Sequence, residues 1–360
     1  MVSALVAFVM LGGLIVVHEV GHWLVARWSG VRILRFSVGF GPRLFSGVRG
    51  HTEYAISAIP LGGYVKMAGE QPDEQAQQPW EYLSKPIETR ARIVFAGPFV
   101  NYLVALASLW LVFVLGYPEL LPIVGKTMDG MPAQAAGLQT GDRIRSIGSR
   151  PIRTWDEMTT LIYAAPDQPL TFVIARGETT MTVAMTPRAK SIADPFGRQK
   201  TVGLIGIVPS GVFESSRVGP LTAIRRTWQQ QNEWIGQTLL GLWSMLTGKL
   251  SVRDSVTGPI GILFLTSEAV RLGLTPVLFL ISLFSLNLAI FNLLPLPILD
   301  GGHLFFLVVE KLRGRPVSLG VQERAAQVSL MLLVALVLVI CVNDVSRFGL
   351  VEKLFGWIHR

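Results

Sequence analysis

Cysteine, charge and histidine are all scarce in this chain of 360 residues. The single cysteine, Cys341, excludes an intramolecular disulfide. Charged residues make up only 16% of the sequence and hydrophobic residues 50%, which excludes an ordinary soluble protein. The net charge of +8 fits the arginine and lysine bias of loops beside membrane segments, and no feature points to nucleic acid as a partner. With only five histidines, a motif that contains two of them rarely arises by chance.

Four apolar segments predict membrane helices. Residues 2–17 carry no charge, 93–117 and 276–299 are long enough to cross a bilayer, and 326–343 are shorter but almost wholly apolar. The first segment lacks the basic start and a convincing cleavage site of a signal peptide, so we expect it to be retained. We therefore expect these segments to lie in a lipid bilayer.

The first apolar segment ends in the sequence His18-Glu19-Val-Gly-His22. Residues four apart on an α-helix share one face, so both histidines can bind one metal ion. Glu19 lies beside this face, where it can act on a metal-bound water, as in HExxH zinc metalloproteases. Ionisable groups within a membrane helix are costly unless they are paired, which favours a functional site. A structural histidine pair, or a site that has lost its metal, is the alternative.

A site with two histidines needs a third protein ligand if its fourth position is left to water. The third apolar segment offers one in Asn292-Leu-Leu-Pro295-Leu-Pro297-Ile-Leu-Asp300-Gly-Gly302. Prolines break a helix and free backbone carbonyls, which lipid tolerates only beside protein or a water-filled cavity. We therefore expect Asp300 to complete a His-His-Asp set that binds Zn²⁺, although these ligand types also suit other divalent ions.

The long segment between the second and third apolar segments is predicted to be soluble. Alternating runs at 170–176 and 180–186 indicate strands and 155–164 a helix, so residues 122–188 should form a small α+β module. A Pro/Gly-punctuated link follows, and then a helix near 219–247. The tryptophans of that helix favour either a position at the membrane interface or packing against the module.

The centre of this module resembles bacterial PDZ domains in the string Met131-Pro-Ala-Gln-Ala-Ala-Gly-Leu-Gln-Thr-Gly-Asp-Arg-Ile144, with Met131 where serine is more usual. Gly137 and Gly141 should supply turns with positive φ, while Ile144 and Ile147 should enter the core. PDZ domains commonly take peptides by strand addition, so a peptide C-terminus is a candidate partner. A size filter or a purely structural cap is the alternative.

Residues 33–67 predict a β-hairpin between the first two apolar segments. Its aromatic and aliphatic residues would let it dip into the bilayer. An exposed strand edge there would be a natural surface for holding an unwound substrate.

The pattern NxxPxPxLDGG, together with HExxH, resembles the site-2 protease family and in particular its bacterial RseP-like members. Further matching pieces are Gly97–Asn101, Pro60–Met67 and Gly258–Ile262. The resemblance implies an intramembrane zinc metalloprotease in which His18, His22 and Asp300 bind zinc and Glu19 acts as the catalytic base. It also implies that Asn292, with Pro295 and Pro297, contacts the substrate backbone. Some members have tandem PDZ domains, whereas residues 195–217 are too few for a second one here.

The resemblance also implies the substrate and the location. The substrate would be a single-span membrane protein already trimmed on its outer side, such as an anti-sigma factor or a signal-peptide remnant. The protein would be a multi-pass protein of the bacterial cytoplasmic (inner) membrane. Arginine and lysine are concentrated after the first span and between the third and fourth, which places those loops in the cytoplasm and the PDZ domain and both termini outside.

The predicted fold class is an α-helical polytopic membrane protein with about four transmembrane helices, a membrane-associated β-hairpin and one inserted α+β PDZ domain. Its segments are the first transmembrane helix with HEVGH (1–27), a cytoplasmic-side loop and β-hairpin (28–90), the second transmembrane helix (91–117), the PDZ domain (118–190), a linker and interfacial helix (191–275), the third transmembrane segment with LDGG (276–310), and a basic loop, fourth transmembrane helix and C-terminal tail (311–360).

Two other functions compete with proteolysis. The chain could be a non-catalytic PDZ-bearing membrane scaffold with a relict metal site, but a relict site has no need of Glu19. An ion or metal transporter would also use broken helices and acidic residues, but the sequence has no internal repeat to support one. Turnover of a substrate separates the three.

Overall fold

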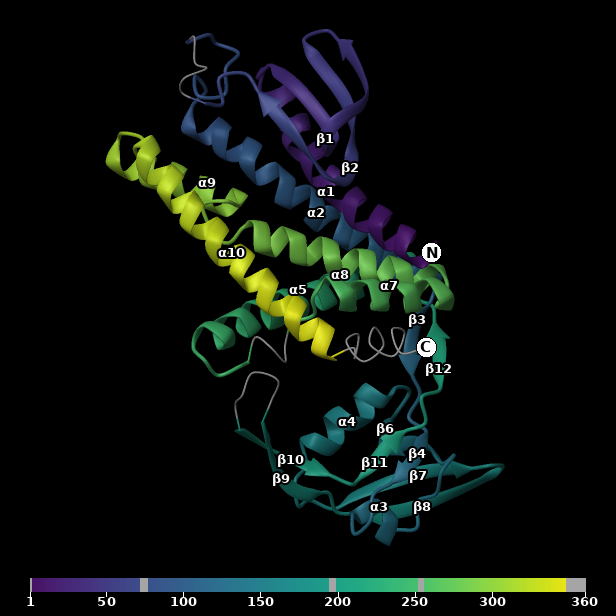
Figure 1. Ribbon diagram of the computed structural model, residues 1–360. Coiled ribbons are helices and arrows are strands. Elements are labelled where there is room, and N and C mark those ends of the chain that lie inside the picture. The colour runs from purple at the N-terminus through teal and green to yellow at the C-terminus, as the bar shows by residue number, and fades with distance from the viewer. Residues whose placement is uncertain (1, 72–76, 194–198, 252–255, 348–360) are drawn as a thin grey trace, which may run out of the picture. The chain divides into compact units, whose positions relative to one another are not determined.

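The computed structural model in Figure 1 describes residues 2–71, 77–193, 199–251 and 256–347. The chain forms two compact units. The first comprises Met1–Val112, Ile224–Thr238 and Val252–Arg360, and the second comprises Phe113–Ala223 and Leu239–Ser251. The predicted C-terminal tail from residue 348 onward lies outside the described residues.

Among the described residues, four helices are long and apolar enough to cross a membrane, and each overlaps one of the four predicted segments. They are α1 (Val2–Trp28), α2 (Ile87–Leu115), α8 (Leu274–Asn292) and α10 (Leu319–Arg347). Large apolar side chains on these helices face outward, and Met331 of α10 is 70% exposed. Such exposure fits helices whose solvent is lipid.

The third predicted span is interrupted, as its prolines predict. Helix α8 ends at Asn292, residues 293–299 form a turn, and α9 (Asp300–Arg313) begins at Asp300. Gly301 and Gly302 let α9 start directly against this turn, because a Cβ at either position would collide with backbone atoms of residues 293–297. The turn and the two glycines together fix the position of Asp300.

An additional short helix, α7 (Pro259–Leu272), lies in the region predicted as a linker and one interfacial helix. It packs against α1 and α8. The buried carboxylate of Asp344, on α10, accepts hydrogen bonds from the backbone N–H groups of Gly258 and Gly261 at 3.2 and 3.0 Å. A carboxylate from a distant helix therefore satisfies the first turn of α7, where backbone donors lack partners within the helix.

Helix α5 (Pro220–Leu246) confirms the helix predicted near 219–247. Trp234 packs edge-to-face against Phe279 of α8, with ring centroids 5.4 Å apart. Trp228 and Trp243 are exposed. One face of α5 thus packs against the helices of the first unit, while other tryptophans remain on the surface.

Buried hydroxyl groups join α8 to α2. Ser282 Oγ donates to the Ala105 carbonyl at 2.8 Å, and Ser285 Oγ donates to the Asn101 carbonyl at 2.7 Å. Gln231 of α5 donates to Ser282 at 3.0 Å. In lipid there is little hydrophobic drive between helices, so small side chains and such hydrogen bonds fix how closely the helices approach.

A buried ion pair joins the start of α2 to the end of α9. Arg90 donates from both terminal nitrogens to the carboxylate of Glu310, and neither side chain is more than 16% exposed. Two-point pairing of this kind sets orientation as well as distance. Helix α9 is therefore fixed to α2 at the end opposite Asp300.

Strands β1 (Ile33–Arg49) and β2 (Thr52–Met67) confirm the predicted hairpin. Residues 63–67 of β2 pair with the beginning of β1, and β2 packs along α1. Phe45 and Val48, near the turn, are 72% and 75% exposed, so this end of the hairpin presents apolar side chains beside its charged ones.

The second unit contains the predicted α+β module. Its central sheet has the order β6-β5-β7-β8, and the pairs β3–β12, β4–β11 and β9–β10 surround it. The strands are β3 (Tyr117–Leu120), β4 (Val124–Thr127), β5 (Arg143–Ile147), β6 (Arg150–Pro151), β7 (Leu170–Arg176), β8 (Thr179–Met185), β9 (Arg188–Ala193), β10 (Gln199–Leu204), β11 (Ile207–Pro209) and β12 (Phe213–Ser216), with helices α3 (Pro132–Ala135) and α4 (Trp155–Tyr163). Residues 199–216, which the sequence predicts to be part of a linker, instead form strands. These strands are short and interrupted by glycines, so their alternation is too weak to be recognised in the sequence.

The core of this unit is apolar. Ile144 and Ile147 are buried within it, and Gly137 and Gly141 have positive φ, as predicted. Met131 is the N-cap residue of α3 and makes no side-chain cap hydrogen bond. Methionine in place of the more usual serine therefore costs this helix a capping hydrogen bond rather than a core contact.

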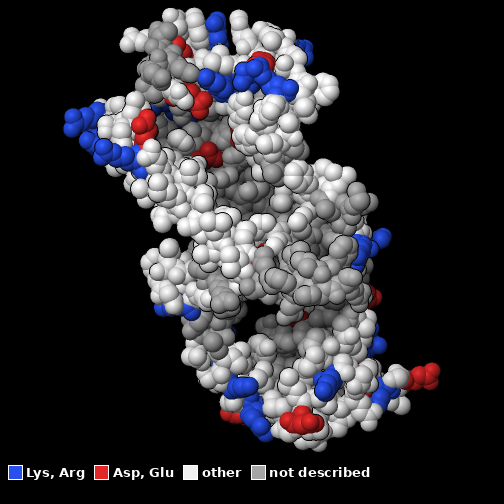
Figure 2. Space-filling view, in the orientation of Figure 1, with Lys and Arg blue, Asp and Glu red and all other residues white. Residues whose placement is uncertain are grey.

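Figure 2 shows charged side chains of the first unit gathered near the β1–β2 hairpin and the turn between α9 and α10, with few charges over the helices. The four candidate spans account for this uncharged surface, since the 18-residue window of each holds at most two charged residues.

Candidate metal centre

Helix α1 places both histidines of the HEVGH sequence on the face that meets α2. Their Nε2 atoms are 3.1 Å apart, and their rings are edge-to-face. Both residues are buried. Gly21, between them, allows close approach, because a Cβ there would lie 2.9 Å from the carbonyl carbon of Ala96.

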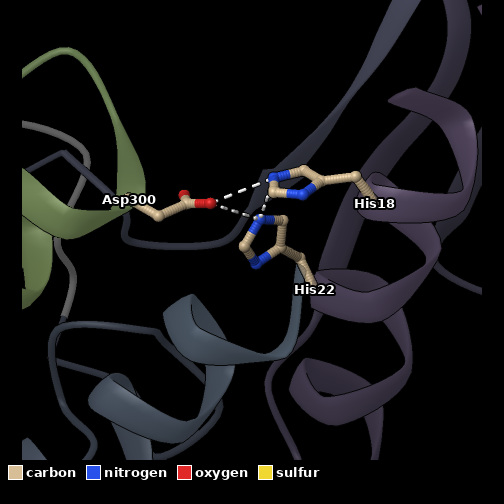
Figure 3. A group of neighbouring side chains, drawn as sticks. All are labelled: His18, His22 and Asp300. Atoms are coloured by element: carbon tan, nitrogen blue, oxygen red, sulfur yellow. Dashed lines mark hydrogen bonds and ion pairs between the residues drawn. The ribbon is translucent and has the colours of Figure 1, made fainter. Parts of the chain in front are cut away.

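Asp300 reaches this pair from the first turn of α9, as Figure 3 shows. Its Oδ2 lies 3.0 Å from His18 Nε2 and 3.5 Å from His22 Nε2. The structure therefore brings together three residues that were predicted from two separate motifs. Each offers a potential ligand atom, and these atoms lie within 4.8 Å of one another.

One face of α2 supports the histidines, through residues 93, 97 and 101. His22 Nδ1 lies 2.8 Å from the carbonyl oxygen of Ile93, to which it donates. Gly97 leaves room for both rings, since a Cβ there would lie 2.7 Å from the Cε1 atom of each. Asn101 Nδ2 lies 3.4 Å from His18 Nδ1. Sequence reasoning assigned no role to this face, although Gly97–Asn101 was among the matching pieces.

Comparison with known proteins identifies the family. Residues 6–336 match the description "Peptidase family M50". The chain belongs to this family. It is 31% identical to protease RseP of Yersinia pestis over 96% of this chain and 98% of that protein, and 29% identical to zinc metalloprotease RasP of Geobacillus kaustophilus over 97% and 99%. It is also similar to the PDZ domain of an SdrC-like protein from Listeria monocytogenes at 20% identity, over 24% of this chain and 84% of that one, with a TM-score of 0.19.

This M50 peptidase is an intramembrane zinc metalloprotease of the site-2 protease type. Its ligand set fits the metal. Tetrahedral Zn²⁺ with ligands at roughly 2.0–2.1 Å holds neighbouring ligand atoms about 3.3 Å apart. The separations here are 3.0, 3.1 and 3.5 Å. The hydrogen bond from His22 Nδ1 to Ile93 also leaves the lone pair of Nε2 free to bind an ion.

The M50 site opens into a cavity of about 890 Å³. Glu19 and Asn292 line it together with His18, His22 and Asp300. Gly63 and Val65 of β2 also line it, and Gly63 lies close to Glu19, since a Cβ on this glycine would be 3.6 Å from Glu19 Cγ. The cavity continues past His303 to the buried Arg90–Glu310 pair, so polar groups line it well beyond the ligands.

The two prolines between Asn292 and Asp300 lie outside the lining of this cavity. Pro295 and Pro297 lie in the turn between α8 and α9 and are not among the residues that line this cavity. His303 lines the cavity about one turn after Asp300 but lies outside the group of three potential ligands. In the M50 peptidase, the prolines therefore shape the turn that delivers Asp300.

Proposed function

We propose that His18, His22 and Asp300 bind the catalytic zinc ion and that Glu19 is the general base for peptide hydrolysis. The observation that carries this proposal is the convergence of three ligand atoms beside a carboxylate in one cavity. Two histidines and one carboxylate leave a fourth coordination position for water, as catalytic zinc requires. Zinc supplies a Lewis acid that activates water and polarises the scissile carbonyl.

The chain's own residues then handle the proton. Glu19 precedes His22 by three residues and follows His18 directly, so its carboxylate lies beside the ligand face of α1. Gly63 of β2 lies close to this side chain. The Glu19 carboxylate accepts the proton of the attacking water and returns it to the leaving amide nitrogen.

Asn292 and the turn after it handle the substrate backbone. Asn292 is the last residue of α8, lines the cavity, and has an amide that can donate to the carbonyl of the scissile bond. Pro295 and Pro297 act on the substrate through this turn, which they keep from continuing α8. The alternative role for Asn292 is to satisfy the broken backbone.

The substrate we propose is the transmembrane segment of a single-span membrane protein. A helical segment hides its carbonyls in hydrogen bonds, so it must unwind before hydrolysis. The edge of β2 offers a place for the unwound segment, because residues 62–65 border the cavity and 63–67 pair with β1 on one side. Strand addition there would bring a peptide bond beside Glu19.

The second unit would act as a PDZ domain outside the cytoplasmic (inner) membrane, with both termini on the same side. There it would filter substrates by size or bind a trimmed peptide C-terminus. A relative from Salmonella typhimurium (strain 14028s), 31% identical, is named regulator of sigma-E protease RseP. By that likeness the substrate would be an anti-sigma factor, with a signal-peptide remnant as the second candidate.

Two measurements test these assignments on purified protein in liposomes. The first is zinc content after stripping and reloading: Asp300→Ala should lose the ion, whereas His303→Ala, in the same cavity, should keep it. A stoichiometric ion in Asp300→Ala would contradict the ligand assignment. The second is cleavage of a single-span substrate with and without a folded outer domain. Equal cleavage of both would contradict filtering by the second unit.

A further inference from the structure

Asn101 is fully buried and lies behind the metal centre on α2. Its Nδ2 is 3.4 Å from His18 Nδ1, while its Oδ1 has no hydrogen-bond partner among the described residues. A buried amide oxygen without a partner is unfavourable, because it has lost its hydrogen bonds to water without replacement. The oxygen and the NH₂ group have nearly the same shape, so a half-turn of the amide exchanges them.

The two amide orientations correspond to two tautomers of His18. With Nδ2 facing the ring, a neutral His18 must carry a lone pair on Nδ1, so Nε2, which lies 3.0 Å from Asp300 Oδ2, carries the hydrogen. With Oδ1 facing the ring, Nδ1–H donates to the amide, and the lone pair of Nε2 is free for an ion. Only the second orientation allows a neutral His18 to bind zinc through Nε2.

Neighbouring residues hold the backbone of Asn101, so that only its side-chain amide has to turn. Ser285 Oγ donates to its carbonyl at 2.7 Å, and both residues are completely buried. Four residues earlier on α2 lies Gly97, whose lack of a side chain admits the two rings. Ile93, a further four residues back, already holds His22 through its carbonyl. Asn101 is therefore placed to accept a hydrogen bond from His18, as the Ile93 carbonyl accepts one from His22.

We propose that Asn101 is a positioning residue for His18. Its amide oxygen accepts from His18 Nδ1–H when zinc is bound, which orients the ring and selects the tautomer that binds metal. The amide turns to donate when the ion is absent. This rests on the proposed ligand role of His18, and it extends that role to a residue that touches neither substrate nor metal.

The test compares zinc affinity in Asn101→Leu, Asn101→Asp and the wild type. The full-length protein in detergent is stripped of metal and titrated with Zn²⁺ against a competing chelator. Leucine offers no acceptor, so affinity should fall about 10- to 100-fold, as is usual when the partner of a ligating histidine is lost. Aspartate accepts from Nδ1–H but cannot donate, so Asn101→Asp should bind zinc at least as tightly as the wild type. Ser282→Ala is the matched control, because it removes the α8–α2 bond one turn away from Asn101 and should leave affinity within about twofold.

Zinc affinity does not depend on which substrate is cleaved, so this test is independent of turnover. The visible spectrum of the Co²⁺-loaded protein gives a second readout, since a reoriented His18 would change the coordination geometry. We expect the spectrum of Asn101→Asp to match the wild type. Should Asn101→Leu fail to fold, Asn101→Asp decides alone. Equal zinc affinity of Asn101→Leu and wild type, or a tenfold loss in Asn101→Asp, would overturn the proposal.

Discussion

The two units of this chain differ in their buried polar groups and in their exposed apolar ones: the first unit buries apolar residues too, but it also encloses several polar side chains. In the first unit, His18, His22, Asn101 and the serines of α8 are buried, while large apolar residues such as Met331 face outward. In the second, the buried cluster is apolar and includes Phe172 and Ile174. The contrast follows from solvent: lipid accepts apolar surface but satisfies no polar group, whereas water does the reverse.

The contrast also suits the place of the proposed catalytic residues in the first unit. A polar group held among apolar helices must find its partner within the protein, so its position is strongly determined. The paired hydrogen bonds of Ser282 and Ser285 and the Arg90–Glu310 pair are such arrangements. They hold α2, α8 and α9 around the three proposed ligands, and this rigidity is what a zinc site requires.

The largest effect should come from filling the space beside the histidines. Gly97→Ala would place a methyl group within 2.7 Å of both rings, which must then move. We expect reduced zinc content and turnover at least about 10²-fold lower, since displacement of about 1 Å at a site is that costly. Gly13→Ala on α1, where a Cβ meets nothing within 4 Å, is the control and should behave as the wild type. Normal zinc binding by Gly97→Ala would show that α2 does not hold the rings.

The next effect tests whether large apolar side chains are buried in the second unit and face outward on the helices of the first. Phe172→Ala should destabilise the second unit by about 3–5 kcal/mol, because the ring is fully buried in its core. Met331→Ala, on the outward face of α10, should change stability by no more than about 0.5 kcal/mol. Pulse proteolysis of the whole protein in increasing urea measures both. Similar losses would mean that the outer face of α10 is packed rather than bathed in lipid.

The smallest effect concerns Asp142, a charged residue that is buried in the second unit. Arg176 donates two hydrogen bonds of 2.8 Å to Asp142, and this pairing holds the pKa of the Asp142 carboxyl below its ordinary value of 3.8. Because the folded pKa is the lower one, the pair stabilises the unit above about pH 3.8, and this contribution is lost as the pH falls through the folded pKa. Urea midpoints in buffers at about pH 4 and below should fall less steeply with decreasing pH in Asp142→Asn. An unchanged slope in that variant would assign the acid sensitivity to other carboxyls.

Much of the site could be predicted from sequence because its residue types are costly in lipid. Two histidines one turn apart, and an aspartate after a proline-broken helix, leave few explanations other than a metal site. The same reasoning anticipated that the third apolar segment is broken at its prolines. The hairpin and helix α4 were equally visible, since their periodicities are strong.

The supporting contacts could not be predicted. The Ile93 carbonyl has no sequence signature, and the Arg90–Glu310 pair joins residues that are far apart in the chain. Gly97 and Asn101 were visible as a matching motif, but their purpose depends on which face of α2 meets α1. Strands β10 to β12 escaped notice because each is short, and β11 and β12 also pair with β4 and β3, which lie far away in the sequence.

The most direct test of the central claim separates metal binding from catalysis in one substitution. Glu19→Gln keeps the shape of the side chain but cannot take a proton from water. Cleavage of a trimmed single-span substrate in liposomes, and zinc content, are measured for this variant and the wild type. We predict equal zinc content with turnover about 10²- to 10⁴-fold lower in the variant. Turnover close to that of the wild type, with zinc still bound, would contradict the account.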